Sequence, residues 1–418
     1  MEQRRGFDMT TLREVVVVDA VRSAIGKSGR DGMRKQGQLC QASAQELLAA
    51  VMRGLLEDVK AKSPKFDEHD IEDVIVGCLS QIGEQGSNVA RVASLLAGIP
   101  EEASACTINQ FCNAGLKGLN FATQAIQTGN GDVMLCAGVE LMSHYGMGSD
   151  IQVAFDAKYP VRFTPRFQEI SMHVPQGLCA EVISADEGHT REDLDRFGMW
   201  SMQKAVEAQR KGWFDNIIPF EYTYEGATWR VETDEVLRPK AVDDPEGFLE
   251  DLARLPAPFK PDGRVTAGNS SQIVDGAAAV LLMSADKAEA LDLEPLAVMR
   301  GMAVAGGAPD PMLLAPIPAA KKALARAGKE IDDMDIIEPN EAFASPCLAF
   351  ANAFGYAYDD PRVNPTGGAI ALGHPIGASG VLYFSEMVRH LRRIKGHWGL
   401  QMLCGGGGLG VAAVIQAV

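Results

Sequence analysis

The sequence has few of the features that mark membrane, secreted or nucleic-acid-binding proteins. It contains no apolar run of about 18 residues, the length that a transmembrane helix needs. Its 8 cysteines are too sparse for a disulfide framework and lack the spacing of a zinc site, so no metal is expected. Basic residues number 39 against 55 acidic ones, a net charge of −16, which disfavours nucleic acid and anionic membranes as partners.

The amino-terminal stretch MEQRRGFDMTTLREVVVVDA passes from charged residues into a valine run without a signal-peptide apolar region or cleavage site. We therefore expect a reducing, cytoplasmic location rather than secretion. In such a compartment an isolated cysteine is either a small apolar core residue or a nucleophile.

Glycine, with 43 residues, is in excess and separates short apolar segments from helical ones. The segments at 14–20, 73–79, 132–138 and 273–284 have the pattern of buried strands, and those at 43–59 and 115–129 have the pattern of helices. This alternation predicts an α/β fold with a mainly covered sheet.

The middle of the chain, from about 142 to 265, does not follow this alternation. It is richer in aromatic and charged residues, and one strong helix is predicted near 191–211. We expect it to be an insertion that caps a site.

The first and last parts of the chain look like two copies of one unit. The stretch CNAGLKG, beginning at Cys112, aligns with HPIGASG, beginning at His374, and both glycines coincide. A strand precedes each stretch, and a helix and a strand follow it. If the two copies pack about a pseudo-two-fold axis, Cys112 and His374 lie at helix N-termini and face each other.

This arrangement would suit a nucleophilic cysteine. A helix N-terminus and a nearby imidazole both lower the pKa of a thiol, and backbone N–H groups at a helix start can hold an oxyanion. For Cys112 the alternative is a buried structural cysteine, and for His374 a satisfied core histidine. The glycines around His374 imply close backbone approach and favour a functional role.

The carboxyl-terminal stretch LCGGGGLGVAAV contains Cys404 and also satisfies the GxGxxG pattern of dinucleotide-binding proteins. That pattern requires a following helix and a later acidic residue. Only eight residues follow Gly410, and they have the pattern of a terminal strand. The dinucleotide interpretation therefore fails.

Taken together, five motifs make the chain resemble the thiolases over nearly its whole length. They are NQFCNAG, CAGVELMS, VTAGNSSQIVDGAA, NEAF with GGAIALGHPIGASG, and LCGGGGLG. The segment 174–197 is similar to bacterial acetyl-CoA acetyltransferases of that family. The resemblance implies two pseudo-symmetric α/β halves with five-stranded mixed sheets, layered α-β-α-β-α, with a loop domain inserted. The expected boundaries are 1–141 completed by about 266–295, a loop domain at 142–265 that covers the active site and binds coenzyme A, and 296–418.

The resemblance also implies a ping-pong reaction on coenzyme A thioesters, which are substrates rather than permanently bound cofactors. Cys112 would carry the acyl group with help from His374, and Cys404 would be the base of the second step. Asn340 would hold a water in one oxyanion hole, and the N–H groups of Cys112 and Gly406 would form the other. Four residues are expected to bind substrate: Arg238, Ser271, Ala267 and Phe343.

The expected activity is that of an acetyl-CoA C-acetyltransferase, which interconverts two acetyl-CoA with acetoacetyl-CoA and coenzyme A. One alternative is a 3-ketoacyl-CoA thiolase for longer or branched chains; another is a non-catalytic acyl-CoA or lipid carrier with the same fold. A homodimer or homotetramer is expected from the family.

Three departures from the family pattern bear on chain-length preference. Asn113-Ala114 stands where a small residue and serine are usual, which removes a hydroxyl near the nucleophile. Pro175-Gln176-Gly177 replaces His-Met-Gly, and the segment PDPMLLAPIP is about two residues shorter than usual.

The other cysteines and histidines are expected to have no catalytic role. We predict that the cysteines fill apolar space and that the histidines are solvated: Cys40, Cys78, Cys106, Cys136, Cys179 and Cys347; His69, His144, His189, His390 and His397.

Overall fold

The computed structural model describes residues 12–28, 37–159, 164–171 and 174–418, so parts of the expected amino-terminal half and loop domain lie outside it. Within these ranges no helix is both long and apolar enough to cross a bilayer. Strands of both halves join in one sheet with the order β11-β12-β13-β10-β1-β9-β5-β3-β4.

The amino-terminal half forms because apolar strands alternate with capped helices. On α1, for example, Ser43 accepts a hydrogen bond from the Glu46 amide. Its elements are β1 (Val15–Ser23), β2 (Gly26–Lys27), α1 (Ala44–Lys62), β3 (Asp73–Gly77), α2 (Val89–Leu96), β4 (Ser104–Ile108), α3 (Ala114–Gln127), β5 (Val133–Leu141) and β9 (Val274–Ser284).

The carboxyl-terminal half repeats this order. Its elements are β10 (Ala297–Gly306), α11 (Pro316–Ala327), β11 (Ile336–Pro339), α12 (Ala344–Phe354), α13 (Ala369–Leu372), α14 (Ser379–Ile394), β12 (Trp398–Gly405) and β13 (Leu409–Ala417). The helix α10 (Ala285–Ala290) links β9 to β10.

Strand directions confirm the predicted repeat. In the amino-terminal half β1, β9 and β5 pair antiparallel, and β5, β3 and β4 pair parallel. In the other half β10, β13 and β12 pair antiparallel, and β12 pairs parallel with β11. The fifth position there holds only the bridge Ile337–Val363, because Pro361 and Pro365 flank Val363 and cannot donate ladder hydrogen bonds.

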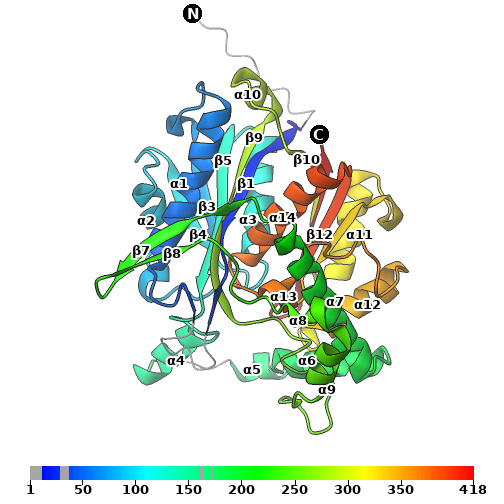
Figure 1. The fold of residues 1–418 in the computed structure, drawn as a ribbon. Coiled ribbons are helices and arrows are strands. Elements are labelled where there is room, and N and C mark those ends of the chain that lie inside the picture. Colours follow the sequence, from blue (N-terminus) through cyan, green and yellow to red (C-terminus); the bar gives the residue numbers. More distant parts are fainter. Residues whose placement is uncertain (1–11, 29–36, 160–163, 172–173) are drawn as a thin grey trace, which may run out of the picture.

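The two repeated helices α3 and α14 pack against each other in the middle of the molecule (Figure 1). Glycines permit this close approach. A Cβ on Gly77 of β3 would lie 2.5 Å from the Gly115 nitrogen and 2.6 Å from the Gly377 oxygen. The segments that precede α3 and α14 are thus held together at the centre.

The insertion runs between β5 and β9; most of its helices lie in the lower part of the view in Figure 1, and its β7–β8 hairpin extends to the left at mid-height. Its longest helix, α7, matches the predicted helix and begins with a capping box between Thr190 and Asp193. Its elements are α4 (Ser149–Asp156), α5 (Pro165–Gln168), α6 (Gln176–Asp186), α7 (Arg191–Arg210), β6 (Ile217–Ile218), β7 (Phe220–Tyr224), β8 (Ala227–Val231), α8 (Lys240–Asp243) and α9 (Pro245–Ala253).

A buried ionic triad ties the insertion to both halves. The guanidinium of Arg22 on β1 bonds both carboxylate oxygens of Asp234, at 2.8 and 2.9 Å, and also pairs with Glu386 on α14. All three side chains are 0–1% exposed. Because a buried charge without a partner is costly, this triad fixes the segment that follows Asp234.

Candidate active site

Cys112 lies in the tight turn that leads from β4 into α3. Phe111 has a left-handed backbone with φ of 54°, and an isolated bridge joins Gln110 and Cys112. The Cys112 side chain is buried with Met142 and Ile376, and Leu79 packs against them. Ile376 is two residues after His374, so the turn that bears the cysteine contacts the segment that bears the histidine.

His374 does not lie directly at a helix N-terminus as expected, since α14 begins five residues later at Ser379. It is nevertheless tied to that helix, because its Nδ1 is 2.6 Å from Ser379 Oγ. The Ser379 hydroxyl donates to the Pro375 carbonyl at 3.1 Å, so Nδ1 carries the hydrogen and donates to Ser379. Nε2 is buried and has no protein partner among the described residues, so it is left as a proton acceptor.

Burial keeps the imidazole neutral. It lowers the pKa of His374 from its ordinary value of 6.5 to about 4. A neutral imidazole with a free Nε2 can act as a general base at neutral pH.

Cys404 lies near the end of β12 and is 1% exposed. Burial raises its pKa to about 11, and a weak hydrogen bond from Asn340 Nδ2, 3.9 Å from its sulfur, opposes that rise. The backbone N–H of Asn340 donates to the Met402 carbonyl at 2.9 Å, and the buried side-chain Oδ1 of Asn340 has no partner in the described residues. The side-chain carboxamide of Asn340 thus lies beside Cys404, and its oxygen is available as an acceptor.

The glycine turn after Cys404 packs on the Cys112 turn. A Cβ on Gly406 would lie 3.3 Å from the Phe111 ring, and one on Gly405 would lie 2.6 Å from the Asn113 carboxamide. The charge of Cys404 also raises the pKa of Cys112, in addition to the larger effect of burial. The two thiols therefore interact, and the expectation of a lowered Cys112 pKa is wrong because burial dominates.

Two residues near this site were missed by sequence reasoning. Glu140 is buried on β5, and its carboxylate accepts from the amides of Leu79, Ser80 and Gly377 at 2.9–3.0 Å. A charged residue inside the apolar strand CAGVELMS was a signal that it had such partners. Asn113 was noted only because it stands where a small residue is usual, but its side chain is 0% exposed and contacts β12.

The four expected substrate-binding residues lie on three segments of the chain. Arg238 is exposed after the Asp234 anchor, and Ala267 is exposed before β9. Ser271 is half-buried, and its amide donates to the Ala342 carbonyl at 3.0 Å. Phe343 is buried and pairs by an isolated bridge with Ser270. Ser271 and Phe343 are therefore neighbours.

Three predictions for the remaining cysteines and histidines are wrong. Cys106 is exposed rather than buried, because β4 is at the edge of the sheet. His189 and His390 are buried rather than solvated, against Tyr358 and Trp213 respectively.

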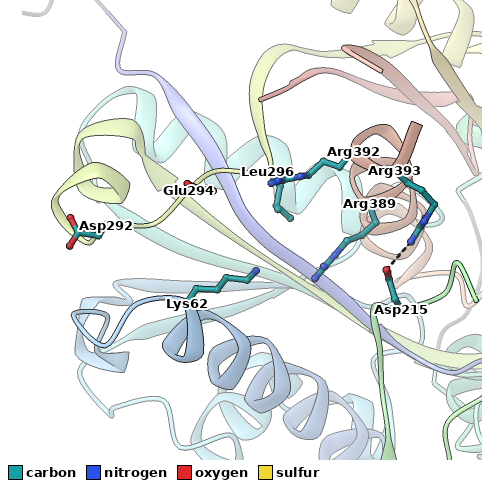
Figure 2. A pocket seen from close by; sticks show the side chains of 8 residues that line it. All are labelled: Lys62, Asp215, Asp292, Glu294, Leu296, Arg389, Arg392 and Arg393. Carbon is teal, nitrogen blue, oxygen red and sulfur yellow. Dashed lines mark hydrogen bonds and ion pairs between the residues drawn. The ribbon is translucent and has the colours of Figure 1, made fainter. Parts of the chain in front are cut away.

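A surface cleft of about 750 Å³ lies at the other end of α14 from His374 (Figure 2). It is lined by four basic and three acidic side chains and Leu296: Lys62, Arg389, Arg392, Arg393, Asp215, Asp292 and Glu294. Lys62 and Arg389 both pair with the buried Asp19, and Arg393 pairs with Asp215 at 2.9 Å. These ion pairs satisfy most of its basic groups, so the cleft does not serve the candidate catalytic residues.

No three histidine, cysteine, aspartate or glutamate side chains of the described ranges gather as metal ligands.

Two family models cover nearly the whole chain: the thiolase N-terminal domain matches residues 15–286, and the thiolase C-terminal domain matches 293–417. A 3-ketoacyl-CoA thiolase of Marinobacter nauticus is 42% identical, over 97% of this chain and 99% of that protein. The 3-oxoadipyl-CoA/3-oxo-5,6-dehydrosuberyl-CoA thiolase of Escherichia coli is 39% identical, over 97% and 100%.

Among solved structures, the acetyl-CoA acetyltransferase of Bacillus anthracis superposes with a TM-score of 0.84. It is 31% identical, and the match covers 98% of this chain and 100% of that one. The repeated halves, the paired thiols and these similarities agree: the chain belongs to the thiolase family and is an acyltransferase.

Proposed function

We propose that the protein catalyses the thiolytic cleavage of 3-ketoacyl-CoA, and its reverse, through an acyl group on Cys112. The observation that supports the proposal is the packing of two segments on the Cys112 turn: the glycine turn after Cys404, and the segment of His374, whose buried Nε2 has no partner among the described residues. Relatives named 3-ketoacyl-CoA or 3-oxoadipyl-CoA thiolase, at 39–42% identity, favour this over an enzyme restricted to acetoacetyl-CoA.

In the first step the Cys112 thiol gives its proton to His374 Nε2, and its sulfur attacks the 3-keto carbon. The bond between carbons 2 and 3 then breaks, and its electron pair forms the enolate of acetyl-CoA. Cys404 protonates carbon 2, which leaves acetyl-CoA, acyl-Cys112, a Cys404 thiolate and an imidazolium. A thiol with a pKa of about 11 is a weak acid suited to an enolate.

In the second step coenzyme A gives its thiol proton to the Cys404 thiolate and attacks the acyl carbon. The Cys112 sulfur leaves and takes back the proton from His374, which restores the starting state. The backbone N–H groups of Cys112 and Gly406, and a water on Asn340, stabilise the developing oxyanions.

Coenzyme A would lie against the loop domain and the segment before β9. Exposed Arg238 is free to reach a nucleotide phosphate, and Ser271 and Ala267 line the approach toward Phe343. Since the triad of Arg22, Asp234 and Glu386 anchors the backbone four residues before Arg238, the phosphate contact would be held at a fixed place.

Two labelling experiments test the mechanism. Incubation with acetyl-CoA should add one acetyl group, found on the Cys112 peptide by mass spectrometry; labelling that persists in Cys112→Ala would contradict the assignment. Cys404→Ala should still be acetylated but should turn over very slowly, and near-normal turnover would remove Cys404 from the mechanism.

A narrower activity, acetyl-CoA C-acetyltransferase, remains the second candidate because of the shortened PDPMLLAPIP segment. Its residues Met312 and Leu313 are buried in the same cluster as Cys404, where they would shorten an acyl pocket. Thiolysis rates for acetoacetyl-CoA and a medium-chain 3-ketoacyl-CoA, measured in one assay, decide between the two. Strong preference for acetoacetyl-CoA supports the narrower activity, and similar or faster rates for the longer substrate support the broader one.

We also propose a homo-oligomer assembled through β4. This strand ends the sheet, and Cys106 on it is exposed. Leu95 and Leu96 on the adjacent α2 and Phe111 at the end of the turn are 41–48% exposed. Open edges of this kind commonly pair with a second copy. Light scattering should give at least a dimer for the wild type and a shift toward monomer for Cys106→Lys.

A further inference from the structure

We infer that Asn113, the residue after the nucleophile, is a positioning residue for Cys404. The inference rests on the proposed function, since it concerns the second thiol of that mechanism. Asn113 is 0% exposed. With its NH2 group toward β12, its carboxamide donates to the carbonyls of Leu403 at 2.9 Å and Cys404 at 3.1 Å.

These two carbonyls belong to the two peptide planes on either side of the Cys404 Cα atom. When both planes are held, the direction of the Cα–Cβ bond is fixed, and with it the region that the sulfur can reach. One side chain, covalently next to Cys112, therefore sets the place of the second thiol relative to the first.

The local structure is built around this contact. Asparagine before a helix usually caps it, but Asn113 makes no side-chain capping bond to α3. Its side-chain carboxamide instead donates to the two carbonyls on β12. The facing residue is Gly405, where a Cβ would lie 2.6 Å from the Asn113 carboxamide and 3.3 Å from the Gln110 carbonyl. A side chain at 405 would displace the carboxamide.

The inference separates the two half-reactions. Acylation of Cys112 needs the nucleophile and His374, whereas removal of an α-proton from acetyl-CoA needs Cys404 in place. Misplacement of a catalytic group by about 1 Å can cost up to about 100-fold in rate. We therefore expect loss of Asn113 to slow α-proton removal by about 10-fold or more and to leave acetylation of Cys112 nearly unchanged.

The test compares Asn113→Ala and Asn113→Asp with the wild type and with Asn120→Asp. Aspartate at 113 keeps the shape of the asparagine side chain, but its carboxylate has no N–H group to donate to the two carbonyl oxygens. Asn120, also buried on α3, accepts from Gln124 through its oxygen, so aspartate keeps that bond and should leave activity unchanged. Acetyl-Cys112 is followed by mass spectrometry, and α-proton removal by deuterium uptake into the methyl group of acetyl-CoA.

Selective loss of deuterium uptake in both Asn113 variants supports the inference. Equal losses in both half-reactions, or no loss in either, would overturn it. If Asn113→Ala does not fold, Gly405→Ala should give the same selective loss, because its methyl group displaces the carboxamide.

An activity-independent readout separates failure of this inference from failure of the proposed function. Cys404 is 1% exposed in the wild type, and its alkylation by iodoacetamide should rise severalfold in Asn113→Ala but not in Asn120→Asp. Unchanged alkylation of Cys404 would refute the positioning role even if the enzyme acts on other substrates. If the wild type is never acetylated, but alkylation of Cys404 rises in Asn113→Ala, the proposed reaction is refuted and the positioning role of Asn113 is not.

Discussion

His374 should give the folded chain a specific sensitivity to acid. In the unfolded chain its imidazole binds a proton at its ordinary pKa of 6.5, and in the folded chain only near 4. Between these values the unfolded state holds more protons, so the free energy of unfolding falls as the pH falls. For pKa values of 6.5 and 4, linkage gives a loss of about 2 kcal/mol between pH 7 and pH 5.

The assay is urea unfolding of the wild type and His374→Asn at both pH values. The asparagine variant lacks this titration, so the stability of the wild type relative to the variant should decrease by about 2 kcal/mol on going from pH 7 to pH 5. His69→Asn is the control. Asp67 raises the pKa of the exposed His69. The stability of the wild type relative to His69→Asn should therefore not decrease between pH 7 and pH 5. An unchanged difference for His374→Asn would refute the neutral buried imidazole.

Three further predictions concern the fold and the nucleophile. Arg22→Met should cost about 3–5 kcal/mol in urea unfolding, because two buried carboxylates lose their partner, whereas Arg300→Met at an exposed pair should cost less than about 1 kcal/mol. Since burial raises the pKa of Cys112, its alkylation by iodoacetamide should be slow at pH 7 and still increase at alkaline pH; a plateau near neutral pH would contradict this. Gly377→Ala should prevent normal folding, since its Cβ would lie 2.6 Å from the Cys78 Cα, whereas Gly306→Ala meets nothing within 4 Å and should behave as wild type in thermal melts.

The sequence was sufficient for the parts of the fold that depend on local pattern. Strands at 14–20, 73–79, 132–138 and 273–284 correspond to β1, β3, β5 and β9, and the helix near 191–211 corresponds to α7. Apolar runs and helical periodicity depend on burial of one segment, so they are visible in the chain itself. The repeat was visible because both copies need glycine at the same close approach of α3 and α14.

Properties that depend on distant contacts were not visible. The bonds from Asn113 reach backbone carbonyls on β12, and any residue type at 403 and 404 provides such carbonyls. The burial of His390 and the raised pKa of Cys112 follow from how completely the elements close over them, which no local pattern reports. The partners of Arg22 are likewise separated by more than 200 residues from it.

The unequal outer edges of the two halves have a consequence for how copies of the chain add to one another. In the carboxyl-terminal half, the Val363 carbonyl accepts from Lys204 Nζ at 2.6 Å, and its amide donates to the Asp360 carbonyl at 3.1 Å. Both backbone groups of Val363 at that edge are therefore used within the chain, while β4 at the opposite end is not covered by a strand in the described residues. A sheet open at both ends would permit head-to-tail growth into a filament, whereas a sheet open at one end permits only a closed, two-fold pairing.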